Sequence, residues 1–173
     1  MHKDTTKRSN QGHYALFPNF DSTSTSQELH SPILESFSNV ICFKFNYFGQ
    51  TKKNYSLLKV GFEDLTHPNK GHNKMIEIKG TESLEWKSFE QQYTNIPRYF
   101  RLKIGLDFSG YLTSDIGIDD IKVENWQCSY YPTSEPIIPP SEQVMDCNFE
   151  KNCNWQTNGF TIGSYSDRKF LIF

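Results

Sequence analysis

The sequence predicts an all-β protein, folded as an antiparallel β-sandwich. Aromatic residues make up 15% of the 173-residue chain, with 14 Phe and 9 Tyr, and such side chains suit the pleated, half-buried surface of strands. Short segments of alternating apolar and polar residues are separated by polar turns, and apolar runs with helical periodicity are rare. Short strands at this spacing favour antiparallel pairing over alternating βαβ units.

The clearest strand pattern runs from Tyr99 to Phe108. Apolar residues at every second position from Phe100 onward form one face, and a mostly polar set that begins with Tyr99 forms the other. Segment 40–49 repeats the pattern and puts Cys42 on the face opposite its aromatic residues. Further strands are expected at 13–17, 29–35, 56–62, 74–79, 86–93 and 116–124.

After residue 128 the composition changes. Four prolines at positions 132, 136, 139 and 140 lie among Ser, Thr and Glu, which is typical of an extended, semi-rigid spacer. We therefore expect three parts: a first domain over 1–128, a Pro/Ser-rich linker over 129–145 and the start of a second domain over 146–173.

The charge pattern argues against nucleic acid as a partner. The formal net charge is -2, and the 18 Lys and Arg are scattered rather than interleaved with aromatic residues. No apolar stretch approaches the ~20 residues that cross a bilayer, and the first residues do not resemble a signal peptide. Taken alone, these features would indicate a cytosolic protein.

The familiar catalytic motifs are absent from the sequence, so we expect no enzyme activity and no required cofactor. There is no His-Glu-x-x-His zinc motif, no Gly-x-Ser-x-Gly elbow and no glycine-rich phosphate loop. His67 and His72 share one polar loop, and their spacing matches neither a helix face nor a strand face. This favours solvated turn histidines over metal ligands.

Asp119 and Asp120 interrupt an otherwise apolar strand. Ile116 and Ile118 precede them on one face, whereas the next apolar residue, Ile121, lies on the other. One carboxylate must then lie against an apolar surface unless a bulge turns it away. Two alternatives stay open: a bulge whose acid accepts hydrogen bonds from backbone amides, or a site for calcium or another cation.

Two further features concern the surface. Asn54-Tyr55-Ser56 is the only glycosylation sequon, and it lies in a polar turn, so Asn54 is the candidate for N-glycosylation after export. Trp86, Trp126 and Trp155 are candidate anchors for a partner or a sugar, but we expect core packing for each.

Several short motifs occur in order along the chain: Asp4-Thr5-Thr6, Gly12-His13-Tyr14, Leu29-His30-Ser31-Pro32, the segment around Cys42, Ile116-Gly117-Ile118-Asp119-Asp120-Ile121, Cys128, and then Cys147-Asn148-Phe149-Glu150 with Cys153-Asn154-Trp155. Together they resemble the MAM domain, an extracellular module of meprins, neuropilins and receptor-type tyrosine phosphatases. The first motif departs from the family pattern, because Thr5 stands where the family usually has His. The resemblance covers about residues 4–128 and, separately, 146–173.

The stretch from Cys147 to Trp155 is similar to the opening of such a module, which the upstream copy lacks. We therefore expect the chain to be cut out of a tandem array. A linker from Ser129 to Val144 extends to about 50 Å at ~3.1 Å per residue, so residues 146–173 can reach back to the open edge of the first copy. Docking there would bury Phe149 and Trp155 and bring Glu150 toward Asp4 and Asp120. The alternative is that residues 146–173 belong to a separate second domain and do not dock on the first copy.

The resemblance implies a jelly-roll sandwich and a non-catalytic adhesion or protein-interaction role in a secreted or cell-surface protein. The implied partners are other extracellular domains, including copies of the module itself. Contact with a membrane would come only through missing parts of the chain. The alternatives are an accessory domain of a secreted metalloprotease and a carbohydrate-binding jelly roll.

The four cysteines support an oxidising, extracytoplasmic location. Of their three possible pairings, only Cys42–Cys128 with Cys147–Cys153 keeps each bond within its own module, and the family implies the same pairing. We expect the first bond to cross the sandwich. The usual Cys-x-x-Cys zinc pairs are absent.

Some MAM domains hold a cation between acids at positions that correspond to Asp4, to Asp119 or Asp120, and to Glu150 of this chain. The resemblance therefore makes these four residues the candidate metal ligands.

Overall fold

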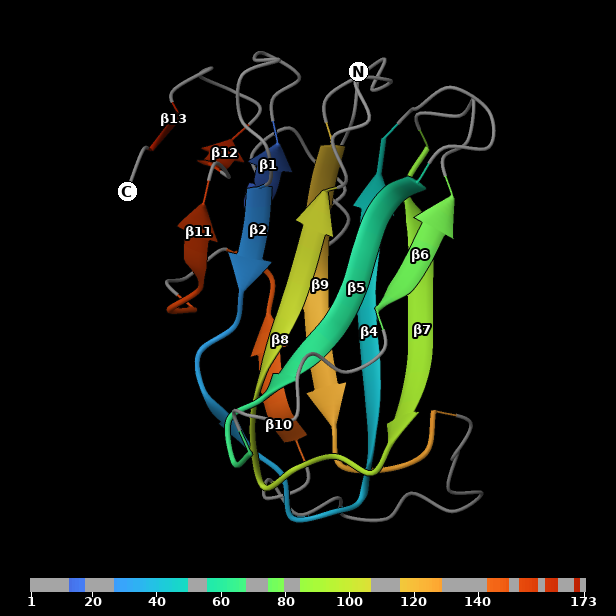
Figure 1. Cartoon of the computed structure of the whole chain (residues 1–173). Helices are drawn as coiled ribbons and strands as arrows, with labels where there is room; N and C mark the ends of the chain where they lie inside the picture. The colour runs from blue at the N-terminus through green and yellow to red at the C-terminus, as the bar shows by residue number, and fades with distance from the viewer. Residues whose placement is uncertain are drawn as a thin grey trace, which may run out of the picture.

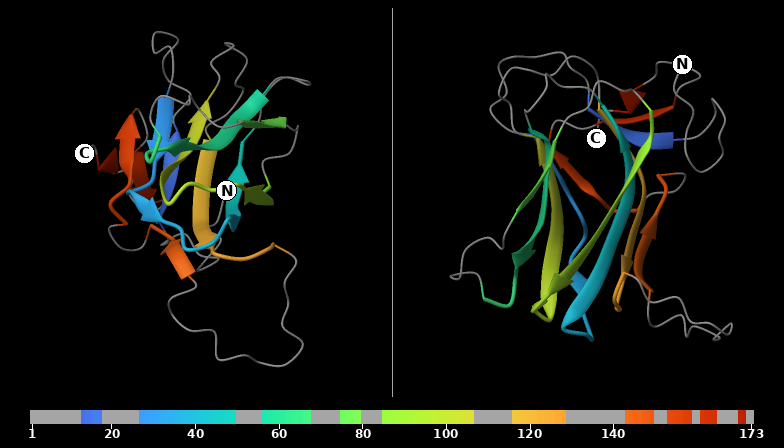
Figure 2. Two further views of the ribbon diagram at one scale, coloured as in Figure 1. Left: turned by 60° about the horizontal axis from the view of Figure 1, so that its bottom comes forward. Right: turned by 90° about the vertical axis from the view of Figure 1, so that its right-hand side faces the viewer.

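The computed structural model describes residues 13–17, 27–49, 56–67, 75–79, 85–106, 116–128, 143–149, 153–158, 161–164 and 170–171. Within these residues every regular element is a strand, and the strands form two antiparallel sheets that pack face to face (Figure 1, Figure 2). The predicted antiparallel β-sandwich is confirmed. No helix in these segments has the length and hydropathy of a membrane span.

The first sheet, here called the β9 sheet, has the order β13-β12-β1-β9-β4-β7, and β10 also pairs with β9. Its strands are β1 (His13–Phe17), β4 (Val40–Phe48), β7 (Lys87–Thr94), β9 (Ile116–Glu124), β10 (Gln143–Cys147), β12 (Thr161–Ser164) and β13 (Phe170–Leu171).

The second sheet, here called the β8 sheet, has the order β11-β2-β8-β5-β6, and β3 also pairs with β8. Its strands are β2 (Gln27–His30), β3 (Leu34–Glu35), β5 (Ser56–Asp64), β6 (Ile76–Lys79), β8 (Tyr99–Leu106) and β11 (Gln156–Asn158).

The core lies between the two sheets and follows the alternation expected from the sequence. In β8, every second residue from Phe100 to Leu106 is at most 5% exposed. In β4, Ile41, Phe43 and Phe45 are buried in the same cluster. The strands expected at 13–17 and 116–124 have these bounds in the structure. Period-2 patterning was therefore sufficient to find the central strands.

The single strand expected over 29–35 is wrong, because the structure breaks it into β2 and β3. Pro32 has no backbone N–H and cannot continue a ladder. At the break, the Ser31 hydroxyl accepts a hydrogen bond from the backbone N–H of Leu102 at 2.9 Å and donates to the Pro32 carbonyl at 2.7 Å. A side chain thus replaces the missing backbone partner, and β3 resumes pairing with β8 at Leu34.

The expected end of the linker is also wrong. Strand β10 begins at Gln143 and pairs with Glu124 of β9, so the last three residues assigned to the linker belong to a sheet. This pairing is long-range, and local composition does not reveal it. Smaller differences affect β5, which runs to Asp64, and β7, which is shifted by one residue.

Residues 143–171 contribute strands to both sheets. On one side of β9, β1 pairs with residues 116–118 and β10 pairs with residues 121–124, so two segments from distant parts of the sequence share one edge. Farther along the chain, β11 pairs with β2 in the β8 sheet, and β12 pairs with β1 in the β9 sheet. These pairings dock the described part of the segment on both sheets, which is one of the two outcomes that the sequence left open. That 146–173 opens a second sequence repeat stays a prediction.

Candidate functional site

The acid pair lies at a bulge in β9. Between Lys44 and Asn46 of β4, the paired residues of β9 shift from Lys122 to Asp119, so β9 holds one extra residue there. Asp120 adopts a left-handed backbone conformation with φ of 50°. The bulge explains why the apolar residues change face at this point, as the first alternative from the sequence predicts.

Hydrogen bonds hold both carboxylates in place. Asp119 is fully buried, and its Oδ1 accepts a hydrogen bond from the backbone N–H of Asp120 at 2.8 Å. Asn46 Nδ2 donates to Asp120 Oδ2 at 3.1 Å, and the hydroxyl of Ser88 donates to Asn46 Oδ1 at 2.7 Å. A chain of polar contacts therefore runs from β7 through β4 to the bulge.

The other two candidate metal ligands, Asp4 and Glu150, lie outside the described residues. Cys147 pairs with Ile121, and Phe149 is 4% exposed in the core, so the segment that leads to Glu150 runs beside the bulge. The acid set thus stays a prediction, and the bulge supplies two carboxylates of the kind that calcium prefers.

The disulfide between Cys42 and Cys128 forms as predicted, with a Cα–Cα distance of 4.8 Å. However, Cys42 lies on β4 and pairs with Glu124 of the neighbouring strand β9, so the bond lies within one sheet. The expectation that it crosses the sandwich is wrong. Cys42 alternates with the core residues of β4 and faces the outer side, where Cys128 reaches it from just beyond the end of β9.

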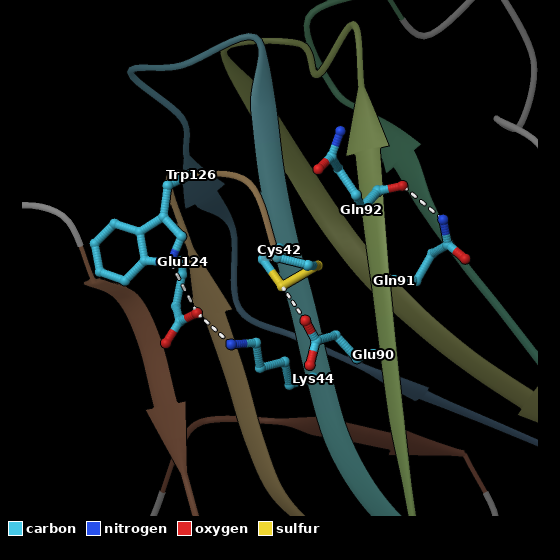
Figure 3. Close-up of a disulfide and its surroundings, with 8 residues drawn as sticks. Cys42, Lys44, Glu90, Gln91, Gln92, Glu124 and Trp126 are labelled. Carbon is cyan, nitrogen blue, oxygen red and sulfur yellow. Dashed lines mark hydrogen bonds and ion pairs between the residues drawn. A yellow bond between two sulfur atoms is a disulfide. The ribbon is translucent and has the colours of Figure 1, made fainter. Parts of the chain in front are cut away.

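Charged side chains surround this disulfide on the outer face of the β9 sheet (Figure 3). Glu90 Oε1 lies 3.9 Å from Cys42 Sγ. Lys44 Nζ lies 2.9 Å from Glu124 Oε2, which also accepts a hydrogen bond from Trp126 Nε1 at 3.0 Å. Glu90 and the two sulfur atoms lie within 4.8 Å of one another, but a disulfide offers no thiolate to a metal.

The second predicted disulfide joins Cys147 and Cys153, with a Cα–Cα distance of 5.9 Å. Cys147 ends β10 in the β9 sheet, and Cys153 precedes β11 in the β8 sheet by three residues. This bond therefore closes the short segment in which the chain passes from one sheet to the other. Phe149, within the loop, and Trp155, just after it, pack against the core as expected.

The order of motifs, the sandwich and the two disulfides agree with one family. The chain matches the family model described as MAM domain, meprin/A5/mu over residues 1–129. The chain belongs to the MAM domain family. Its match ends just after Cys128, so strands β10 to β13 lie beyond the matched part of the MAM domain.

Solved structures support the fold of this MAM domain. One of them, with the printed title "PbXyn10C CBM APO", is a carbohydrate-binding module with a TM-score of 0.50 and 17% sequence identity. The similarity covers 88% of this chain and 86% of that chain, and it establishes the jelly-roll-like sandwich alone. No curated protein matches the chain closely enough to count as a relative.

The histidine loop of the MAM domain is only partly described. His67 has 54% of its side chain exposed, and its Nδ1 lies 3.2 Å from Asp64 Oδ2. Burial would raise the pKa of Asp64, but hydrogen bonds from the backbone N–H groups of His67 and Thr66 lower it below its usual value. Asp64 thus caps a turn, and the His67 ring lies beside its carboxylate. His72 and the glycosylation candidate Asn54 lie outside the described residues.

The tryptophans differ among themselves. Trp86 packs edge-on against Tyr14 and Phe48, and Trp155 packs against the main core, as expected. Trp126 instead lies half-buried beside the Cys42 disulfide, where its indole N–H binds Glu124.

The sequence interpretation missed one group of surface residues. Among the residues that the structure describes, Ile33, Phe37 and Tyr99 are the exposed large hydrophobic side chains, with 60%, 77% and 40% of their surfaces accessible. Ile33 and Phe37 lie on either side of β3, and Tyr99 pairs with Glu35 of that strand. For Tyr99 the sequence did hold a signal of exposure, because the alternation of residues 99–108 puts this ring on the polar face of its strand.

Proposed function

We propose that this MAM domain is a non-catalytic adhesion and protein-interaction module of a secreted or cell-surface multidomain protein. The observation that carries the proposal is the family match over residues 1–129, because MAM is a family of non-catalytic extracellular modules. The two disulfides agree with it, since such bonds persist in oxidising compartments.

The fold suits this role. Both sheets bury their inner faces, so recognition falls to outer faces, edges and connecting segments. Aromatic and Arg side chains that stay exposed on a rigid frame are among the residues that most often anchor protein partners. The partners proposed for the domain are therefore other extracellular domains, including a second copy of the chain.

A binding assay on the intact chain tests the proposal. Beads that display the disulfide-bonded protein should bind each other or individual members of a panel of purified extracellular domains. The same protein, reduced and alkylated, is the control for correct folding. Absence of binding both to itself and to the whole panel contradicts the proposal.

Carbohydrate binding is a second candidate, favoured by the fold similarity to a carbohydrate-binding module. Exposed aromatic residues such as Tyr99 could stack on sugar rings. Screening the same beads on a glycan array separates the two functions. Binding to glycans without binding to any protein would favour this second candidate.

Cation binding at the Asp119–Asp120 bulge is a proposal about stability rather than catalysis. It rests on the burial of Asp119 and on the oxygen ligands that calcium prefers. A role as an accessory domain of a secreted metalloprotease concerns the surrounding protein, and the module itself would still be non-catalytic.

A further inference from the structure

One end of the β8 sheet carries an apolar surface with a single ion pair in it. We define the β3 corner as Ile33, Glu35, Phe37, Arg98 and Tyr99. The connection from β2 to β4, which contains β3, lies at the lower end of the sandwich in Figure 1. Of the described residues, the three large hydrophobic side chains that stay exposed are gathered here.

The strand register puts this surface on the outer side of the sheet. Leu34 pairs with Phe100, and both are buried, so these two side chains point into the core. The preceding residue Ile33 and the following residue Glu35 therefore face outward. Glu35 pairs directly with Tyr99, which brings an exposed acid beside an exposed aromatic ring.

Arg98 completes the corner. Its Nε and Nη2 both lie 2.9 Å from Glu35 Oε1, and its guanidinium carbon lies 5.3 Å from the centre of the Tyr99 ring. The Arg98 side chain is 66% exposed and that of Glu35 is 35% exposed. An ion pair so accessible to water adds little to the stability of the fold. Stability within one molecule is therefore a weak reason for this arrangement.

Hydrogen bonds keep the corner rigid. The backbone N–H of Ser36 donates to the Arg98 carbonyl at 2.8 Å, and the Ser36 hydroxyl donates to Asn125 Oδ1 at 3.1 Å. On the other side, the backbone N–H of Tyr99 donates to the hydroxyl of Thr66 at 3.1 Å. A preformed surface loses little conformational entropy when it binds.

The charges of the corner make it complementary to itself. It carries one cation and one anion, beside apolar side chains, so two copies related by a two-fold axis can place Arg98 of each against Glu35 of the other. Arg and aromatic residues are also the types most enriched at the centres of protein interfaces. We propose that the β3 corner is a self-association surface, whose partner is the same corner of a second copy of this chain.

The size of the surface predicts a weak contact. Three such side chains expose on the order of 300 Å², whereas a stable interface buries about 800 Å² on each partner. Single copies would bind transiently, and many copies on opposed surfaces would hold by avidity. This inference rests on the proposed adhesion function, for which it names the surface and the partner.

Charge exchange between two copies tests the proposal. Two-colour beads would display the full chain as wild type, Arg98→Glu or Glu35→Arg. Each variant alone places like charges opposite each other and should reduce bead aggregation about tenfold or more. Mixing Arg98→Glu beads with Glu35→Arg beads restores both opposite-charge contacts, so aggregates of mixed colour should return. Phe37→Ser should reduce aggregation in every combination.

A second exposed ion pair, Lys79–Glu77 on β6, provides the matched control. Lys79→Glu and Glu77→Lys should leave aggregation unchanged, and thermal melts should show that all variants fold. Aggregation that survives Arg98→Glu, or that mixing does not restore, overturns the proposal. Failure of the wild-type beads to self-associate also overturns it, but binding to another extracellular domain would then leave the proposed function standing.

Discussion

The two disulfides of this MAM domain differ in sequence separation and in whether they lie within one sheet or between the two sheets. Cys42 and Cys128 are separated by 86 positions, yet their bond stays within one sheet, between β4 and the end of β9. Cys147 and Cys153 are separated by 6 positions, yet their bond closes the passage from one sheet to the other. Loop length thus predicts how strongly each bond restricts the unfolded chain, and position predicts which contacts depend on it.

The largest expected effect belongs to the long loop. Replacing both Cys42 and Cys128 by Ala should lower the free energy of unfolding by about 4–5 kcal/mol, because a loop of this length restricts the unfolded chain most. Urea unfolding of the variant and the wild type measures the difference. A loss smaller than that from opening the short loop would reverse the comparison.

Phe149 tests whether the short loop also holds core contacts. Phe149→Ala should cost about 3–5 kcal/mol, because this 4% exposed ring packs in the main cluster. Asp146→Ala, on the exposed side of β10, is the control and should cost less than ~0.5 kcal/mol. Hydrogen exchange on both variants should show that Phe149→Ala speeds exchange in β10 and β11 most. If the amides of β10 and β11 exchange as fast in the wild type as in Phe149→Ala, these strands are not docked in the wild type.

Opening the short disulfide should have a smaller effect than either change. Replacing Cys147 and Cys153 by Ala should cost about 2 kcal/mol on loop length alone. Because Cys147 is 1% exposed in the core, any additional loss measures the packing around the passage between sheets. Urea unfolding of this variant and of the Phe149→Ala variant, compared with the double variant of both sites, would show whether the two losses couple.

The bulge in β9 separates the half of the strand that pairs with β1 from the half that pairs with β10. Asp119→Asn should lower stability by about 1–2 kcal/mol, because a neutral amide oxygen accepts the Asp120 N–H bond more weakly and the new buried N–H2 group needs partners of its own. Thermal melts with and without calcium test the cation proposal. A rise in the melting temperature with calcium, present in the wild type and lost in the variant, is the expected result. Identical melts would leave the hydrogen-bonded bulge as the account of the site.

The smallest expected effect belongs to Tyr93, which links the two sheets by a hydrogen bond rather than by a disulfide. Its hydroxyl donates to the Val60 carbonyl of β5 at 3.2 Å, so Tyr93→Phe should cost about 1 kcal/mol. Burial raises the pKa of Tyr93 above its usual value of 10.0. The folded state therefore holds this proton longer than the unfolded state does, and the contribution is lost as pH rises above about 10. Urea unfolding at neutral and alkaline pH should show a steeper decline in the wild type than in Tyr93→Phe.

The sequence predicted the elements whose structure depends on local alternation. The bounds of β1 and β9 and the inward residues of β4 and β8 follow from period-2 patterning. The sequence interpretation failed at two places for different reasons. It overlooked a local signal, because Pro32 lacks the backbone N–H that a continuous strand over 29–35 needs. It also could not find β10, because Gln143 joins a strand only through its long-range pairing with Glu124 of β9.

The candidate site was predictable to a similar extent. The apolar phase change located the bulge at Asp119 and Asp120, and the family supplied both disulfide pairings. The exposure of Ile33 and Phe37 was not predictable, because it depends on how the connection between β2 and β4 folds after Ser31.

The pairing of β1 with β12 has a mechanical consequence. His13 pairs with Ser164, and Leu16 pairs with Thr161, so the upstream end of β1 and the downstream end of β12 lie at the same end of the ladder. A pull applied through His13 and Ser164 would act along the hydrogen bonds and break them one pair at a time. Such a load unzips strands at low force, whereas a load along the strands would shear all their bonds together. We therefore expect tension through these two residues to detach β12 first, while the disulfide between Cys147 and Cys153 keeps its own short loop closed.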